Sequence, residues 1–84
     1  SLMKFISEIQ VSLKSGHLDP EGLTIKKSLL SLNYDIEEVK TSKIYKIKIS
    51  APSIDEAKII TDEICKRLLV NPTKDEYKIQ VEKV

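Results

Sequence analysis

The sequence predicts an α+β domain, in which an antiparallel sheet of three or four strands carries two helices on one face. Three segments alternate apolar and polar residues with the period of a strand. Two segments between them have helical spacing and begin with N-cap residues. The order of these segments is that of a ferredoxin-like variant, β-α-β-(β)-α-β. We expect residues 3–84 to form this single domain, and Ser1 and Leu2 resemble a cloning remnant.

The first strand is predicted over residues 4–14, KFISEIQVSLK. One face of this segment carries the apolar side chains of Phe5, Ile9, Val11 and Leu13. The other face carries charged and polar residues, as a strand with one wet face requires. Ile6 and Ser7 interrupt the alternation.

The first helix is predicted over residues 20–33. Asp19 can accept hydrogen bonds from the first turn, and Pro20 is tolerated at the first helical position. The apolar stripe consists of Ile25, Leu29 and Leu32, widened by Leu23 and Leu30. Asn33 is a suitable residue for the end of the helix.

The second extended segment, residues 36–50, is longer than an ordinary strand. It is either one long strand or two segments divided at Thr41–Lys43 by a bend, a bulge or the tight reversal of a hairpin, and the pattern does not choose between them. A capping box, Ser53 to Glu56, then begins a second helix. Its stripe consists of Ile54, Ala57, Ile60, Ile64 and Leu68, and Asn71–Pro72 ends it. Tyr77, Ile79 and Val81 mark a closing strand.

The composition excludes several classes of protein. The 14 basic and 13 acidic residues give a net charge of +1, which argues against nucleic-acid binding. No apolar run is long enough to span a bilayer, and no signal peptide is evident. The single Cys65 cannot form an internal disulfide, so we expect a cytoplasmic protein. The exposed edges of an open sheet favour an oligomer.

The stretch SLKSGHLDPEG, residues 12–22, contains the only histidine and both glycines, which makes it a candidate reaction centre. His17 and Asp19 could belong to a catalytic group only with a nucleophile beside them. Asp19 is better explained as a helix cap, which also accounts for Gly16 and Pro20. His17 is then an exposed loop residue. We therefore expect no catalytic residue in this chain.

Metal and cofactor sites are not expected either. His17 and Cys65 match no zinc spacing, and no glycine-rich phosphate loop occurs. We expect Cys65 to be an inert core residue. The cluster of Lys40, Lys43, Lys46 and Lys48 is offset by neighbouring acids and is typical of a solvated strand face.

Four segments resemble the PurS family, the small subunits of phosphoribosylformylglycinamidine (FGAM) synthase. VSLKSGHLDPEG (11–22) is similar to that family's V-x-L-K-x-G-x-L-D-P-x-G, and SLLSLNY (28–34) is similar to its helix end. VKTSKIYKIKI (39–49) and EICKRLLVNPTKDEYKIQV (63–81) match in order and spacing. Asn33 and Ser42 replace glycines of the family pattern, and a Ser42 that needed glycine backbone angles would alter the central turn.

The resemblance implies a non-catalytic subunit of an ATP-dependent carbon–nitrogen ligase complex in purine biosynthesis. The complex converts FGAR, glutamine and ATP to FGAM. This subunit would bridge the glutaminase and synthase subunits, assist ammonia transfer and form a dimer or tetramer. It would bind no cofactor itself, whereas ATP and Mg would bind the large synthase subunit. An ACT-like domain that senses small molecules and dimerises is the alternative, and a stand-alone enzyme using His17 is a third reading.

The resemblance also suggests candidate positions for contacts with the partner subunits. They lie in the loop before the first helix and at the end of the second, with one lysine between: Lys14, Asp19, Pro20, Gly22, Lys43, Asn71 and Pro72. A second interpretation has equal support. In it, Asp19 and Pro20 only begin the first helix, and Asn71 and Pro72 only end the second. The sequence does not say which surface meets which partner.

Overall fold

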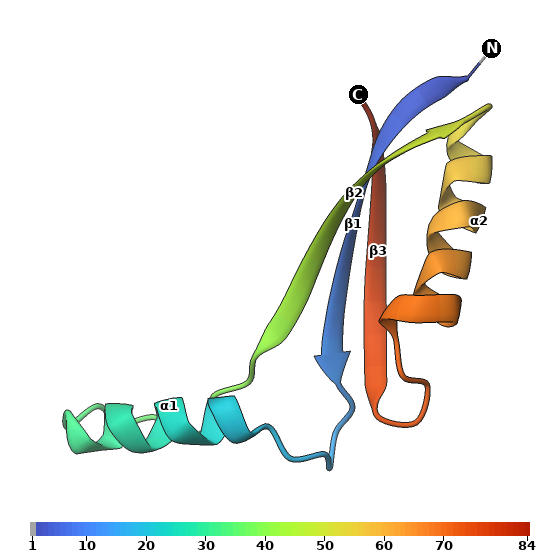
Figure 1. Ribbon diagram of the computed structural model, residues 1–84. Coiled ribbons are helices and arrows are strands. Elements are labelled where there is room, and N and C mark those ends of the chain that lie inside the picture. Colours follow the sequence, from blue (N-terminus) through green and yellow to red (C-terminus); the bar gives the residue numbers. More distant parts are fainter. Residues whose placement is uncertain (1) are drawn as a thin grey trace.

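The computed structural model describes residues 2–84 as a three-stranded antiparallel sheet with two helices (Figure 1). The elements in chain order are β1 (Met3–Leu13), α1 (Pro20–Ser31), β2 (Ser42–Ala51), α2 (Ile54–Ile64), the π-helical turn η1 (Cys65–Leu69) and β3 (Asp75–Lys83). The strand order is β2-β1-β3, so β1 is central. The predicted α+β class, with three strands and two helices, is confirmed.

The core lies between the sheet and α2. One cluster of buried residues consists of Phe5, Ala51, Ala57 and Val81, with Met3, Ile49 and Ile60 packed against them, and Ile9 and Cys65 are also fully buried. Ser7, which interrupts the predicted alternation, faces this layer and is buried. Its hydroxyl lies 2.6 Å from the hydroxyl of Thr61 on α2, which itself donates to the Ala57 carbonyl. A buried polar residue is therefore tolerated because it has a partner.

The placement of α1 differs from the prediction. Only α2 lies on the sheet, while α1 extends away from the end of the sheet (Figure 1). Residues 19–41, which comprise α1 and the segment that returns to β2, are called the arm below. The radius of gyration is 16.8 Å, against about 12 Å for a compact chain of this length. The helical stripe correctly predicts that α1 has an apolar side, but it does not say what covers it.

The second extended segment is neither a long strand nor a hairpin. Residues 36–41 form no strand and return along the arm, and β2 begins at Ser42, opposite Ser12 of β1. Ser42 therefore needs no glycine backbone angles. Within residues 2–84, positive φ occurs at Gly16 and at Asn33, whose φ is 68°. Asn33 and Tyr34 donate to the carbonyls of Leu30 and Leu29, which is the Schellman ending in which asparagine can replace glycine.

The second helix ends differently from the predicted stripe. The amide of Val70 donates to the carbonyl of Cys65, five residues earlier, so η1 is a wide turn. The widening changes the helical phase, and Leu68, predicted on the buried stripe, is 80% exposed. The capping prediction is confirmed, because the Ser53 hydroxyl accepts from the Glu56 amide. No helix in residues 2–84 is long and apolar enough to cross a lipid bilayer.

Candidate partner interface

The antiparallel sheet brings the candidate positions to one end of the molecule. The carboxyl end of β1 lies beside the beginnings of both neighbouring strands, because Ser12 pairs with Ser42 and Leu13 with Asp75. The loop after β1, the start of β2 and the loop before β3 therefore meet there. Residues far apart in sequence form one surface for a simple topological reason.

Asp19 fixes the base of the arm. Its carboxylate caps α1 by accepting from the Gly22 amide at 3.0 Å, as predicted. The same carboxylate accepts from the Thr41 amide at 2.7 Å and from the Thr41 hydroxyl at 2.9 Å. These contacts join the first turn of α1 to the residue that precedes β2. Sequence reasoning missed Thr41, because no local pattern reports a partner 22 residues away.

Pro20 and Gly22 complete the turn for different reasons. Pro20 occupies the first position of α1, where a missing amide hydrogen costs nothing. Gly22 is buried, and a Cβ added to it would lie 2.3 Å from the backbone oxygen of Val39. Only glycine allows the return segment to approach the helix this closely. The D-P-x-G sequence is thus a cap, a helix start and a backbone contact.

Lys14 connects the loop after β1 to the loop before β3. Its ammonium group donates to the Pro72 carbonyl at 2.7 Å, and its amide donates to the Lys74 carbonyl at 2.8 Å. The loop that contains Asn71 is shaped by its own bonds. The Asn71 side chain accepts from the Thr73 amide, and the Asn71 amide donates to the Asp75 carboxylate. Asp75 is a second residue that sequence reasoning missed.

Lys43 lies on the strand rather than in a loop. It is exposed near the start of β2, opposite Val11, with its ammonium group 5.7 Å from the centre of the Tyr45 ring. Lys43 and Tyr45 border a groove of about 300 Å³, together with Val11, Leu13 and Leu69. The groove also reaches Glu21 at the base of the arm. Lys43 therefore shares this end of the sheet with the other six positions.

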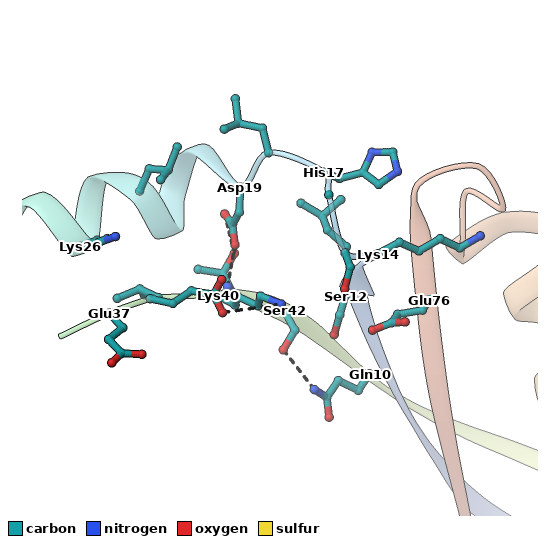
Figure 2. A pocket seen from close by; sticks show the side chains of 18 residues that line it. Gln10, Ser12, Lys14, His17, Asp19, Lys26, Glu37, Lys40, Ser42 and Glu76 are labelled. Atoms are coloured by element: carbon teal, nitrogen blue, oxygen red, sulfur yellow. Dashed lines mark hydrogen bonds and ion pairs between the residues drawn. The ribbon is translucent and has the colours of Figure 1, made fainter.

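A larger hollow of about 620 Å³ lies between the arm and the end of β1 (Figure 2). Its charged side chains have both signs and come from the loop, the arm and β3: Lys14, Asp19, Lys26, Glu37, Glu38, Lys40 and Glu76. His17 also borders it and is exposed, as predicted. Because its charges have both signs, the hollow does not form the concentrated basic surface that would attract an anion.

The remaining reactive groups are engaged or buried. The Cys65 thiol is buried, as predicted, and burial raises its pKa. Asp62 lies beside it and accepts from Tyr77 and from Lys66, whose ammonium group is 2.9 Å away. Hydrogen bonds from Lys66 and then Tyr77 lower the pKa of Asp62. In residues 2–84, no three of the histidine, cysteine and acidic side chains gather as a metal site would require.

The Asp19 contacts give the arm a pH dependence. Hydrogen bonds from the Gly22 amide, and then from Thr41, lower the pKa of Asp19 below its ordinary value of 3.8. The ionised carboxylate therefore stabilises the folded arm above that ordinary value, and this contribution is lost as the pH falls through the lower folded-state pKa. We expect the amide proton signal of Thr41 to shift in NMR spectra only in this acidic range. The Asp19→Asn variant should lack the transition, and a midpoint at or above the ordinary value would contradict the assignment.

Comparison with known proteins identifies the family of this chain. Residues 6–83 match the family model described as PurS: Phosphoribosylformylglycinamidine (FGAM) synthase. The chain is 32% identical over 79 residues to the PurS subunit of that synthase from Methanothermobacter thermautotrophicus, covering 94% of each chain.

Two solved structures share the fold. The PurS crystal structure from Methanocaldococcus jannaschii is 37% identical, with a TM-score of 0.84 over 95% of this chain and 98% of that one. A chain of the PurLQS structure from Thermotoga maritima is 29% identical, with a TM-score of 0.79 over 100% and 99% of the two chains. The arm is more than a quarter of this chain, so a TM-score of 0.84 requires a similar arm direction in the archaeal protein.

The family match, the relatives and the fold agree with the motifs in the sequence, and they replace the ACT-like alternative. The chain therefore belongs to the PurS family, and it is a subunit of FGAM synthase, the ATP-dependent ligase complex of purine biosynthesis.

Proposed function

We propose that this chain bridges the glutaminase and synthase subunits of the complex and assists the transfer of ammonia between them. It catalyses no reaction itself, and it associates with further copies of itself as a dimer or tetramer. ATP and Mg bind the large synthase subunit, and the complex works in the cytoplasm. The similarity to a chain of the Thermotoga maritima PurLQS structure supports a role inside such an assembly.

The observation that carries the proposal is the use of the polar groups at the end of the sheet. The Asp19 carboxylate is occupied by Gly22 and Thr41, and the Lys14 ammonium by the Pro72 carbonyl. These groups shape a surface instead of presenting a nucleophile or a free base. A surface built in this way suits a subunit that works through contacts with partner proteins.

Holding two active sites in register has a clear chemical purpose. Ammonia released near neutral pH is rapidly protonated, and the ammonium ion is not a nucleophile. A bridging subunit raises the effective concentration of free ammonia at the second site. In this proposal Lys14, Asp19, Pro20, Gly22, Lys43, Asn71 and Pro72 form the surface that contacts the partner subunits.

The proposal is tested by reconstituting the synthase and glutaminase subunits with and without this chain. Omission should reduce glutamine-dependent FGAM formation by on the order of 100-fold, as loss of effective concentration predicts. Turnover by the synthase with added ammonia should persist. Undiminished glutamine-dependent activity without the chain would refute the bridging role.

The contact surface is tested separately with Lys14→Ala. This variant should raise the concentration of the chain needed for half-maximal glutamine-dependent activity. Lys83→Ala is the matched control, because Lys83 is exposed at the opposite end of the sheet, beside Phe5. Equal behaviour of the two variants would exclude Lys14 from the contact surface.

A further inference from the structure

The turn that ends α2 departs from the helix that precedes it. Thr61 and Cys65 are fully buried on one side of α2. A helix that continued at about 100° per residue would bring Leu68, three residues after Cys65, to the same side. Instead, the wide turn η1 leaves Leu68 80% exposed, while Leu69 and Val70 are half-buried. The sequence therefore also fits an α-helical ending that differs from the one in the structure.

The wide turn is not an ordinary helix ending. A Schellman ending also contains a hydrogen bond between residues five apart, but it needs a residue with positive φ. In residues 2–84 positive φ occurs only at Gly16 and Asn33, so η1 lacks that feature. Its closing bond runs from the Val70 amide to the Cys65 carbonyl and encloses one residue more than an α-helical turn does. The turn is therefore a one-residue insertion at the end of the helix.

The residues around this insertion can shift by one position and keep the character of the packing. In an α-helical ending the Leu69 amide would replace the Val70 amide at the Cys65 carbonyl. Leu68 would then take the place of Leu69, one leucine for another. Leu69 would take the place of Val70, which keeps an apolar side chain in a half-buried position. Because the side chains exchanged are alike, the two endings bury similar apolar groups.

Contacts on both sides confine the shift to this turn. Upstream, Asp62 accepts from the hydroxyl group of Tyr77 on β3 and from Lys66, four residues later, a spacing that an α-helix also allows. Downstream, the Asn71 carbonyl accepts from the Asp75 amide at 2.8 Å, so the loop before β3 has a turn of its own. Only the segment between Lys66 and Asn71 has to change.

We propose that η1 is a register switch. In the first register the turn is π-helical, Leu69 borders the groove beside Lys43, and Leu68 is exposed. In the second register α2 continues as an α-helix, Leu68 borders the groove, and the loop before β3 gains one residue. That residue adds up to about 3.5 Å to the reach of the loop.

The switch gives the loop before β3 two lengths. This loop contains Asn71 and Pro72, two of the positions proposed to contact the partner subunits, and the Lys14 ammonium holds the Pro72 carbonyl at 2.7 Å. A partner protein that draws the loop outward would favour the second register. This use of the switch rests on the bridging role proposed above, whereas the exchange between registers is a property of the chain alone.

The exchange is tested by relaxation-dispersion NMR on the purified chain, because helix register shifts occur on the μs–ms timescale that this method detects. The amide signals of Leu69 and Val70 should show dispersion, since the bond to the Cys65 carbonyl passes from one amide to the other. Leu68→Ser should abolish this dispersion, because a serine is disfavoured at the apolar groove. The melting temperature of this variant should stay within about 4 °C of the wild-type value, because Leu68 is exposed in the first register.

Leu18→Ser is the matched control, because Leu18 is 70% exposed in the loop before α1. It should leave the dispersion at Leu69 and Val70 unchanged. Flat profiles in the wild-type chain would overturn the switch. Dispersion that persists in Leu68→Ser would overturn it as well.

Deletion of Leu68 tests the equivalence of the registers without depending on a timescale. The shortened chain combines the α-helical ending with the present loop length, so it should melt within about 8 °C of the wild type. Deletion of Lys58, an exposed residue inside α2, is the control, because it turns Thr61 and Cys65 about 100° away from the core and should abolish cooperative unfolding. Equal destabilisation by the two deletions would overturn the proposal. The reconstitution that omits this chain tests bridging separately, so failure of the switch and failure of bridging are distinguishable.

Discussion

Gly22→Ala is expected to destabilise the protein by about 1–3 kcal/mol, the usual cost of forcing a methyl group into a packed site. The new Cβ would lie 2.3 Å from the Val39 carbonyl oxygen, and a backbone atom cannot turn aside as a side chain can. The return segment must therefore move away from α1, and the Asp19 contacts to Thr41 move with it. Helix propensity alone predicts the opposite sign, because alanine favours an α-helix over glycine by about 1 kcal/mol.

Urea unfolding of the variant measures this balance. Ser28→Ala is the matched control, because Ser28 is exposed on the same helix and gains only the propensity of alanine. We expect Ser28→Ala to be neutral or slightly stabilising. A Gly22→Ala protein that is as stable as the wild type would show that the close approach to Val39 is not required.

Thr61→Val should cost about 1–3 kcal/mol, because it leaves a buried hydroxyl group without a partner. The Thr61 hydroxyl donates its one hydrogen to the Ala57 carbonyl at 2.7 Å, so the Ser7 hydroxyl donates to Thr61. Valine keeps the shape of threonine but cannot accept, and Ser7 is then unsatisfied in the core. Ser7→Ala should cost less, since Thr61 retains its bond to Ala57. For a domain of this length, each kcal/mol corresponds to about 4–8 °C in Tm.

A double-mutant cycle isolates the bond. Adding Ser7→Ala to Thr61→Val should recover stability, because no hydroxyl is then stranded. Thr24→Val is the control, since the Thr24 hydroxyl also donates to the carbonyl four residues earlier but is exposed to water. Thr24→Val should change the free energy of unfolding by no more than about 0.5 kcal/mol. Strictly additive costs for Ser7 and Thr61 would contradict the assigned donor and acceptor.

The elements of the fold could be predicted because their signals are local. Alternation of apolar residues predicts β1 and β3, and capping residues predict the beginnings of α1 and α2. The direction of α1 could not be predicted in this way. It depends on Asp19 bonding to Thr41 and on Gly22 contacting Val39, and neither pairing leaves a pattern in the sequence between them.

The candidate interface, too, could be predicted from the sequence only in part. The resemblance to a family supplied the seven positions, and Asp19 could be assigned as a cap from its place before proline. That these positions lie together at one end of the sheet could be seen only from the strand order. Because β1 is central, the loop after it, which contains Lys14, lies beside the loop before β3, which contains Pro72. Leu68 shows where periodicity fails, because the π-helical turn over Cys65–Leu69 changes the helical phase and leaves Leu68 at the surface instead of on the predicted stripe.

The projecting arm divides the molecule into two cooperative units of unequal strength. The sheet and α2 share a buried core, whereas the helix of the arm is held mainly by its own turns and by the bonds at its base. An isolated helix of this length is marginal in water. Amide hydrogens of residues 23–31 should therefore exchange with solvent faster than those of β1, a difference that hydrogen–deuterium exchange measures directly. Local opening of the arm can thus occur while the sheet and α2 stay folded.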